Sequence, residues 1–392
     1  MASIRHETAS LQLISGHGLF KIDVTAVPSG GIIMPLKNIS VMIKPASSLC
    51  NLRCRYCFYA DISQNRETAS NGIMDEGTCD TVIDRISEAL GGHGTANISF
   101  QGGEPTVAGL KYFIHFTETM KKYPHVRVNY ALQTNGTLID EEWAKFFHDN
   151  HFLIGISLDG YKLNMDQFRF DAENSSVYDR IMKTVKLLRK YKVEFNILSV
   201  VTKQLAEHPK ALAKFYRDQK FDYVQLIPCL PGFCDKEDPF ALTPEKYASF
   251  YIDFFDEWLR YARNGTFISV GLFENLHAMV HGQMPYQCGM LGRCTVQYVI
   301  ESNGDTYPCD FFCLDEYRLG NLKTDSFESL FNTETAKTFI NESECTKKPC
   351  GTCRYMNMCN GGCRRQNICY LNEEECAYLK VLDHVLPVLS KM

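Results

Sequence analysis

The feature that most constrains the fold of this chain is a regular alternation of short apolar runs with amphipathic stretches of helical period. The apolar runs are rich in Val, Ile and Phe, have the length of buried strands, and lie at 39–43, 98–101, 126–133, 153–158, 194–200 and 223–227. The helical stretches lie between them, at 75–90, 109–122, 140–150, 178–191 and 209–219. Because neighbouring parallel strands need a crossover, this pattern predicts an α/β fold with a parallel sheet, whose ligands bind at the carboxyl ends of the strands.

The alternation has clear limits along the chain. Residues 1–33 show little periodicity and end in a Pro-Ser-Gly-Gly linker, while beyond a helical stretch at 244–262 the chain becomes loop-rich. One hairpin is expected there, with 297–301 and 306–307 flanking Asn303-Gly304. We therefore expect four parts: an N-terminal extension, tag or disordered arm at 1–33, a barrel-like sheet domain at 34–240, a helical connector at 241–284 and a small cysteine-rich domain at 285–392.

Composition excludes several classes of function. The net charge of −5 and the scattered Lys and Arg argue against nucleic acid, and no apolar run approaches the roughly 20 residues that span a bilayer. The seventeen cysteines are concentrated at 50–57 and 288–376, and no signal peptide precedes them. This distribution favours a cytoplasmic, metal-binding protein over a secreted disulfide scaffold.

Three of these cysteines directly follow the first expected strand. Cys50, Cys54 and Cys57 have the spacing C-x3-C-x2-C, which can hold three irons of a [4Fe-4S] cluster and leave the fourth iron open. Zinc would require a fourth Cys or His nearby, and none follows shortly after Cys57. The spacing, followed by Phe58-Tyr59, resembles the radical S-adenosylmethionine (SAM) superfamily. The resemblance implies a partial (β/α)6 TIM-type barrel and generation of a 5′-deoxyadenosyl radical from SAM.

Loops at the ends of later strands also resemble that superfamily. The string Gln-Gly-Gly-Glu-Pro at 101–105 contains two glycines that let backbone carbonyl groups approach a ligand closely. The resemblance implies SAM contacts for Tyr59, Gln101, Gly102, Gly103, Glu104 and Ser157. For Asn135 and Asp159, which lie in similar loops, a turn-stabilising role explains the residue type equally well.

The C-terminal cysteines resemble the SPASM domain, an extension that holds two auxiliary clusters. The resemblance assigns auxiliary cluster I to Cys288, Cys294, Cys309 and Cys363, and auxiliary cluster II to Cys350, Cys353, Cys359 and Cys376. With four cysteines for each cluster, every iron has a protein ligand and none is open to substrate. Electron transfer and structural support are therefore the expected roles. Two zinc sites remain an alternative, because four thiolates suit zinc as well. Cys313, Cys345 and Cys369 are left over as packing residues, although Cys345 could replace Cys350.

Strings at 43–48, 132–140, 192–198 and 307–311 narrow the resemblance to the anaerobic sulfatase-maturating enzymes, over about 34–389. Membership implies three [4Fe-4S] clusters and SAM as cofactors. The expected reaction converts Cys or Ser of a sulfatase, in a Cys/Ser-x-Pro-x-Arg motif, to Cα-formylglycine.

Asp310, beside Cys309, matches the base of the family. Tyr59 is expected near the substrate, with packing as its alternative. A flavodoxin- or ferredoxin-type electron donor and a monomeric enzyme are expected.

One departure from the family and two alternative functions stay open. Family members commonly carry a His shortly after the Asp159-Gly160 pair, and this chain has none, which leaves substrate contacts on that loop in doubt. The main alternative is a maturase that forms thioether or carbon–carbon crosslinks in a ribosomal peptide, although 33 residues before the barrel are too few for a leader-binding domain. An iron–sulfur electron carrier is disfavoured by the open iron. The substrate protein and the choice between Cys and Ser are not determined by the sequence.

Overall fold

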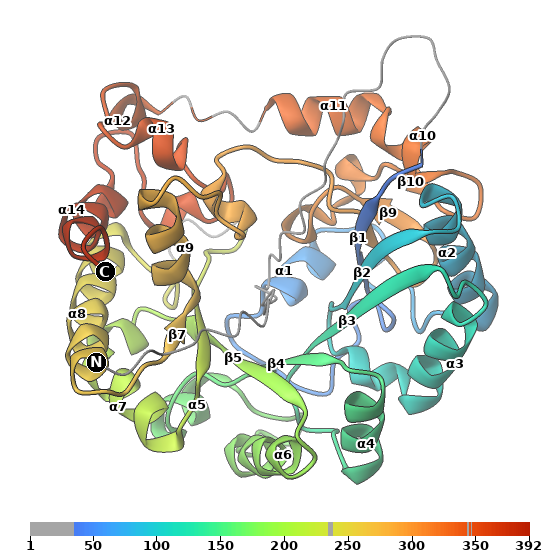
Figure 1. Ribbon diagram of the computed structural model, residues 1–392, viewed down its shortest axis with the longest axis horizontal. Helices are drawn as coiled ribbons and strands as arrows, with labels where there is room; N and C mark the ends of the chain where they lie inside the picture. The colour runs from blue at the N-terminus through green and yellow to red at the C-terminus, as the bar shows by residue number, and fades with distance from the viewer. Residues whose placement is uncertain (1–34, 234–237, 343–344, 346) are drawn as a thin grey trace, which may run out of the picture.

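The computed structural model describes residues 35–233, 238–342, 345 and 347–392, so the expected N-terminal extension at 1–33 lies outside it. Its centre is one curved sheet with the strand order β10-β9-β8-β1-β2-β3-β4-β5-β6-β7 (Figure 1). The parallel strands β1 to β7 follow the chain order, with bounds Asn38–Ile43, Gly94–Phe100, Val126–Thr134, Leu153–Ser157, Glu194–Val201, Tyr223–Pro228 and Ser269–Val270. The predicted parallel sheet is therefore confirmed, and β7 is an addition too short to leave a sequence signal.

Helices cover the convex side of this sheet, as the crossovers require (Figure 1). They are α2 (Glu76–Ala89), α3 (Leu110–Met120), α4 (Glu141–Asp149), α6 (Tyr178–Lys190), α7 (Pro209–Gln219) and α8 (Pro244–Arg263). Aspartates begin two of them: Asp75 accepts a hydrogen bond from the backbone N–H of Thr78, and Asp140 accepts one from that of Trp143. All five predicted crossover helices are present. The sequence pattern missed α1 (Phe58–Gln64) and α5 (Lys162–Phe168), each about two turns long.

The predicted hairpin is present, and it continues the sheet of the barrel. It consists of β8 (Val299–Ile300) and β9 (Asp305–Tyr307), and β10 (Gly320–Asn321) pairs with β9. Strand β8 pairs in parallel with β1, so that Met42 lies opposite Val299 and Ile43 opposite Ile300. Nothing in the sequence indicated this pairing, because two-residue strands have no periodicity. It places the hairpin next to β1, at the edge of the parallel strands.

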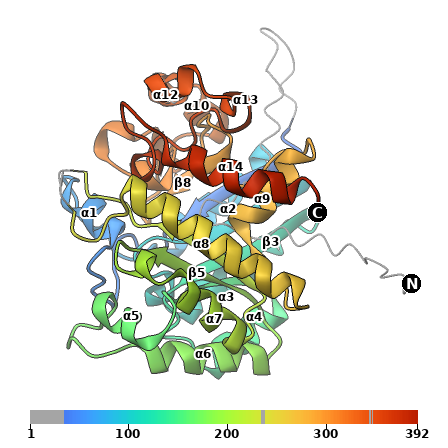
Figure 2. The same ribbon diagram turned by 90° about the vertical axis from the view of Figure 1, so that its left-hand side faces the viewer.

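The C-terminal part contains more helix than the sequence pattern indicated. Helix α9 (Gly271–Val280) follows β7, and the short helices α10 to α13 span Phe327–Phe331, Glu334–Asn341, Lys348–Gly351 and Met356–Cys359. The last helix, α14 (Ala377–Leu389), packs against α8 and α9 (Figure 2). The expectation of a loop-rich end was wrong for α14, whose interior Pro387 reads as a helix breaker in sequence. No helix among the described residues has both the length and the apolar character needed to span a membrane.

A buried ion cluster reinforces the junction between β1 and β8. The ammonium of Lys44 lies 2.8 Å from Oε1 of Glu301, and the guanidinium of Arg66 lies 2.6 Å from the same oxygen. All three side chains are almost fully buried. Burial alone acts to raise the pKa of Glu301, but the two cations lower it to about 2. The C-terminal hairpin is thus held to the barrel by a carboxylate that is ionised at neutral pH.

We predict that Glu301→Gln lowers the free energy of unfolding by about 3 to 5 kcal/mol, because it leaves two buried cations without their counterion. Thermal unfolding followed by circular dichroism without oxygen measures the effect. The matched control is Glu118→Gln, which removes an exposed ion pair with Lys121 and should cost at most about 0.5 kcal/mol. Equal melting temperatures for the two variants would show that the buried cluster does not stabilise the junction.

Candidate functional site

A cavity lies at the carboxyl ends of the parallel strands. This is the place where ligands bind in sheets of this topology. Its lining contains every residue that the sequence assigned to the first cluster and to SAM: Cys50, Cys54, Cys57, Tyr59, Gln101, Gly102, Gly103, Glu104 and Ser157. The structure therefore brings these residues together from loops that are far apart in sequence.

The three cysteines of the first motif face one another in this cavity. Burial raises the pKa of Cys50 to about 11 and that of Cys54 to about 12, and the neighbouring thiols, Cys57 among them, add to both shifts. The guanidinium of Arg169 opposes the shift of Cys54 and lies 3.9 Å from its sulfur atom. Three converging thiols in such a place become thiolates only when a positive group joins them, so the donor set fits an iron–sulfur cluster.

Close contact between two loops shapes the SAM side of the cavity. A Cβ atom on Gly103 would lie 2.2 Å from the carbonyl oxygen of Leu49, so only glycine allows the loop after β2 to touch the cysteine loop. The buried carboxylate of Glu104 accepts hydrogen bonds from the hydroxyl groups of Thr106 (2.6 Å) and Thr134 (2.7 Å) and from the backbone N–H of Asn135 (2.7 Å). The side chain of Glu104 therefore holds the loops after β2 and β3 in place. The backbone groups of these loops remain available to a ligand.

Asp159 anchors the opposite wall through a buried ion pair. Its carboxylate lies 2.7 Å from Nε of Arg169 and accepts hydrogen bonds from the hydroxyl of Tyr56 and, at 2.8 Å, from the backbone N–H of Val200. The carboxylate of Asp159 is thus engaged by groups of the protein, and Asp159 is not among the residues that line the cavity. Arg169, which reaches from this pair to Cys54, was missed, because an arginine in sequence does not reveal that it is buried.

Asp310 lies at the edge of the same cavity and is fully buried. Its Oδ2 accepts hydrogen bonds from the hydroxyl of Tyr59 (2.6 Å) and from Nε2 of Gln101 (3.2 Å), and Gln101 also donates to Tyr59 (2.7 Å). Oδ1 has no hydrogen-bond partner among the described residues. Burial raises the pKa of Asp310 to about 6, although Lys44 opposes the shift. One carboxylate oxygen is thus held in place and the other is free, beside a cavity wall that includes Phe311.

The four cysteines expected at auxiliary cluster I line a second, smaller cavity. Cys288, Cys294, Cys309 and Cys363 all face it. Burial raises the pKa of Cys309 well above its ordinary value, and Cys288, Cys363 and Cys294 contribute to the shift. This set joins the hairpin to the loop before α14, and its mutual proximity again fits a cationic cluster.

The remaining expected cysteines also gather, together with one more. Burial raises the pKa of Cys350 to about 12, with contributions from Cys345, Cys376 and Cys359, and Cys353 lies close to Cys359 and Cys376. The sulfur atoms of Cys345 and Cys350 are 3.5 Å apart. Every cysteine in the described part of the chain is free, so these thiols form no disulfide.

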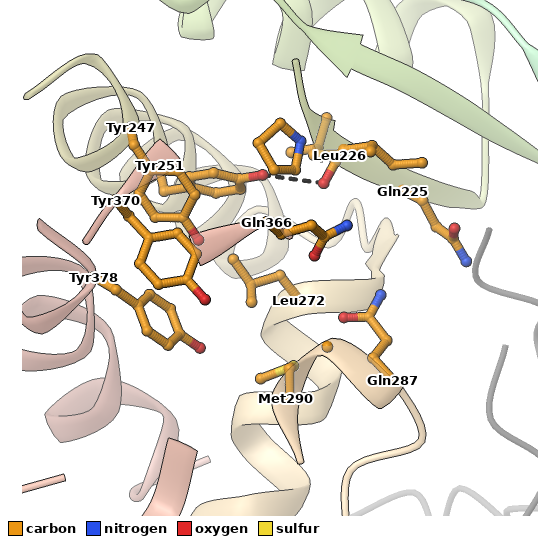
Figure 3. Close-up of a pocket in the computed structure, with 13 residues that line it drawn as sticks. Gln225, Leu226, Tyr247, Tyr251, Leu272, Gln287, Met290, Gln366, Tyr370 and Tyr378 are labelled. Carbon is orange, nitrogen blue, oxygen red and sulfur yellow. Dashed lines mark hydrogen bonds between the residues drawn. The ribbon is translucent and has the colours of Figure 1, made fainter. Parts of the chain in front are cut away.

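A cluster of tyrosines separates the two auxiliary sets and was not found from the sequence. The side chains of Tyr370 and Tyr378 lie side by side in a pocket that Gln225, Gln287 and Gln366 also line (Figure 3). The hydroxyl of Tyr251 donates to the carbonyl of Leu226 at 3.0 Å in the same pocket (Figure 3). Burial raises the pKa of Tyr370, and thiols of both sets contribute to the shift. Tyr370 is therefore the side chain that lies between the sets.

Two family profiles match the chain where the structure places these sites. The Radical SAM superfamily matches residues 45–216, and an iron–sulfur cluster-binding domain, SPASM, matches residues 288–359. The first range includes the cavity with Cys50, Cys54 and Cys57, and the second includes most of the auxiliary thiols. The partial radical SAM barrel with a SPASM extension, expected from the sequence, is confirmed, as are SAM and iron–sulfur clusters as its cofactors.

Similar proteins extend over most of the chain. A cysteine-type anaerobic sulfatase-maturating enzyme of Clostridium novyi is 43% identical over 84% of this chain and 89% of its own length. A serine-type anaerobic sulfatase-maturating enzyme of Bacteroides thetaiotaomicron is 28% identical over 91% of both chains. The solved structure of native anSMEcpe with bound AdoMet and Cp18Cys peptide has a TM-score of 0.83, with 36% identity over 90% of this chain and 98% of that one.

We predict that protein purified without oxygen contains about twelve irons, because three cubane clusters contain four each. Replacement of Cys50, Cys54 and Cys57 by Ala should remove about four of them and abolish reductive cleavage of SAM. Iron analysis and chromatography of 5′-deoxyadenosine measure the two effects. Replacement of buried Cys79 by Ala is the matched control, because its thiol faces Tyr112 outside the three sets, and it should keep all the iron. Cleavage of SAM by the triple variant would refute the assignment of the first cluster.

Proposed function

The chain belongs to the family of anaerobic sulfatase-maturating enzymes, and from this membership we propose that it oxidises a cysteine or serine side chain of a sulfatase to Cα-formylglycine. The observation that carries the proposal is the position of Asp310, whose carboxylate is held by Tyr59 and Gln101 of the radical SAM cavity and keeps one oxygen without a hydrogen-bond partner among the described residues. A base in this place can accept the side-chain proton of a substrate residue whose Cβ reaches the cavity. The comparisons favour this reaction over the crosslinking of ribosomal peptides.

We assign the first cluster to Cys50, Cys54 and Cys57, and with SAM it supplies the hydrogen-atom abstraction that starts the oxidation. The residues of the chain then have separate tasks. The loop of Gly102 and Gly103 and the side chain of Ser157 bind SAM at the cavity wall. Ser157 accepts a hydrogen bond from Nε2 of Gln133 at 3.0 Å, which fixes its hydroxyl oxygen on that wall.

Tyr59 and Gln101 act on the substrate side rather than on SAM alone. Both donate to Oδ2 of Asp310, so the carboxylate cannot rotate and Oδ1 remains directed away from them. Burial excludes water from this oxygen, and a substrate thiol or hydroxyl is then its proton donor. Cys309, the next residue toward the N-terminus, belongs to the thiols that we assign to auxiliary cluster I. The proton acceptor therefore lies beside the cluster that would accept the electron.

We also propose a cytoplasmic monomer that receives electrons from a flavodoxin- or ferredoxin-type donor. The free cysteines support a reducing compartment.

We predict that Asp310→Asn separates radical formation from aldehyde formation. The amide keeps the size of the side chain and its contacts with Tyr59 and Gln101, but it cannot accept a proton. SAM should still be cleaved to 5′-deoxyadenosine, while formylglycine decreases by a factor on the order of 10² to 10⁴. Mass spectrometry of a Cys-x-Pro-x-Arg peptide and chromatography of 5′-deoxyadenosine measure the two products. A wild-type yield of aldehyde would exclude Asp310 as the base, and loss of both products would indicate a structural role.

We predict that the enzyme oxidises cysteine more efficiently than serine in otherwise identical peptides. The support is the higher identity to a cysteine-type relative, 43%, than to a serine-type relative, 28%. The measurement is kcat/KM for paired Cys-x-Pro-x-Arg and Ser-x-Pro-x-Arg peptides. A higher kcat/KM for serine would reverse the assignment, and absence of aldehyde from both peptides would favour the crosslinking maturase.

A further inference from the structure

Five thiols, rather than four, surround the position expected for auxiliary cluster II. Four of them are those assigned above, and the fifth is Cys345. Its sulfur atom lies 3.5 Å from that of Cys350. A fifth thiol inside a set of ligands differs from an isolated packing cysteine. Cys313 and Cys369 show the contrast, because each is fully buried with its thiol near a backbone carbonyl, of Cys309 and of Cys229 respectively.

The loop of the cluster contains a glycine where Cys345 approaches it. A Cβ atom on Gly361 would lie 2.2 Å from Cβ of Cys345 and 2.7 Å from its sulfur atom. Any larger residue at position 361 would therefore displace Cys345 from the set. On the other flank, the ammonium of Lys347 donates to the carbonyl of Leu371 at 3.1 Å, which ties the segment with Cys345 and Cys350 to the chain just before Cys376.

The separation of the two sulfur atoms decides what the fifth thiol can do. Each iron of a [4Fe-4S] cluster takes one protein thiolate. Two tetrahedral thiolates on one metal ion, at metal–sulfur distances of about 2.3 Å, lie about 4 Å apart. The 3.5 Å between Cys345 and Cys350 therefore places both thiols within reach of the same iron, and only one of them can bind it at a time.

We propose that Cys345 and Cys350 are interchangeable ligands for one iron of auxiliary cluster II, whereas its other irons have a single ligand each. This proposal rests on the assignment of that cluster under the proposed function. It concerns metal binding alone, so its test does not use the oxidation of a peptide.

The test compares four variants purified without oxygen: Cys345→Ala, Cys350→Ala, the double variant and Cys353→Ala. Iron and sulfide analysis, with Mössbauer spectroscopy, measures how many clusters each contains. Each single change within the pair should keep about twelve irons, because the remaining thiol completes the cluster. The double variant should lose about four irons, and so should Cys353→Ala, the matched control, because the sulfur atom that Cys345 contacts is that of Cys350.

Three results would overturn the proposal. First, Cys350→Ala could lose as much iron as Cys353→Ala, or aggregate as much. The proposal predicts the opposite, because Cys345 would bind the iron in place of Cys350 and the protein would stay soluble with its cluster. Cys345→Ala alone could lose the cluster, which would make Cys345 the sole ligand. The double variant could keep twelve irons, which would exclude both thiols. Failure of the underlying cluster assignment is distinguishable, because the wild-type protein would then contain zinc or fewer irons.

Discussion

The carboxylate of Glu301 between Lys44 and Arg66 is the interaction on which the geometry of the site depends. Lys44 follows β1 and Glu301 follows β8, so their ion pair locks together the ends of two strands whose register is otherwise set by only two residue pairs. Strand β1 leads into the cysteine loop, and the hairpin that starts with β8 leads to Cys309 and Asp310. The pair therefore sets the distance between the cysteine loop and Asp310. It must be buried to do so, and a buried carboxylate is stable here because two cations neutralise it.

Lys44 connects this ion cluster to the rest of the cavity. Its ammonium lies 5.3 Å from the centre of the Tyr59 ring, and its aliphatic chain would be 2.9 Å from a Cβ atom on Gly102. The same side chain thus touches the loop expected to bind SAM and the tyrosine that holds Asp310. Because these contacts converge on one buried lysine, a shift of the hairpin would displace the loop of Gly102 and Asp310 together. The barrel and the cysteine-rich domain consequently act as one catalytic unit.

The sequence predicted those parts of the molecule that depend on local pattern. The crossover strands and helices have clear periods, so the fold was expected correctly, and the thiols that the spacings C-x3-C-x2-C and C-x2-C-x5-C-x3-C bring into motifs gather in the structure. Contacts between distant segments were not predicted. Strand β8 is two residues long, and α14 contains Pro387, so neither has a readable period. Arg169 and Glu301 look like ordinary surface residues in sequence, and only the tertiary structure shows that both are buried beside opposite charges.

The auxiliary thiols also explain why the C-terminal segment needs metal to hold its shape. Helices α12 and α13 have four residues each, and neither has a side-chain cap. Among their residues only Cys350 is buried, so the hydrophobic effect contributes little to their stability. Burial and neighbouring thiols raise the pKa values of Cys350, Cys359 and Cys376, and without a cation these groups remain protonated and make few favourable contacts. Cluster binding releases those protons and joins the segments, so the free energy of metal binding becomes free energy of folding for this part of the chain.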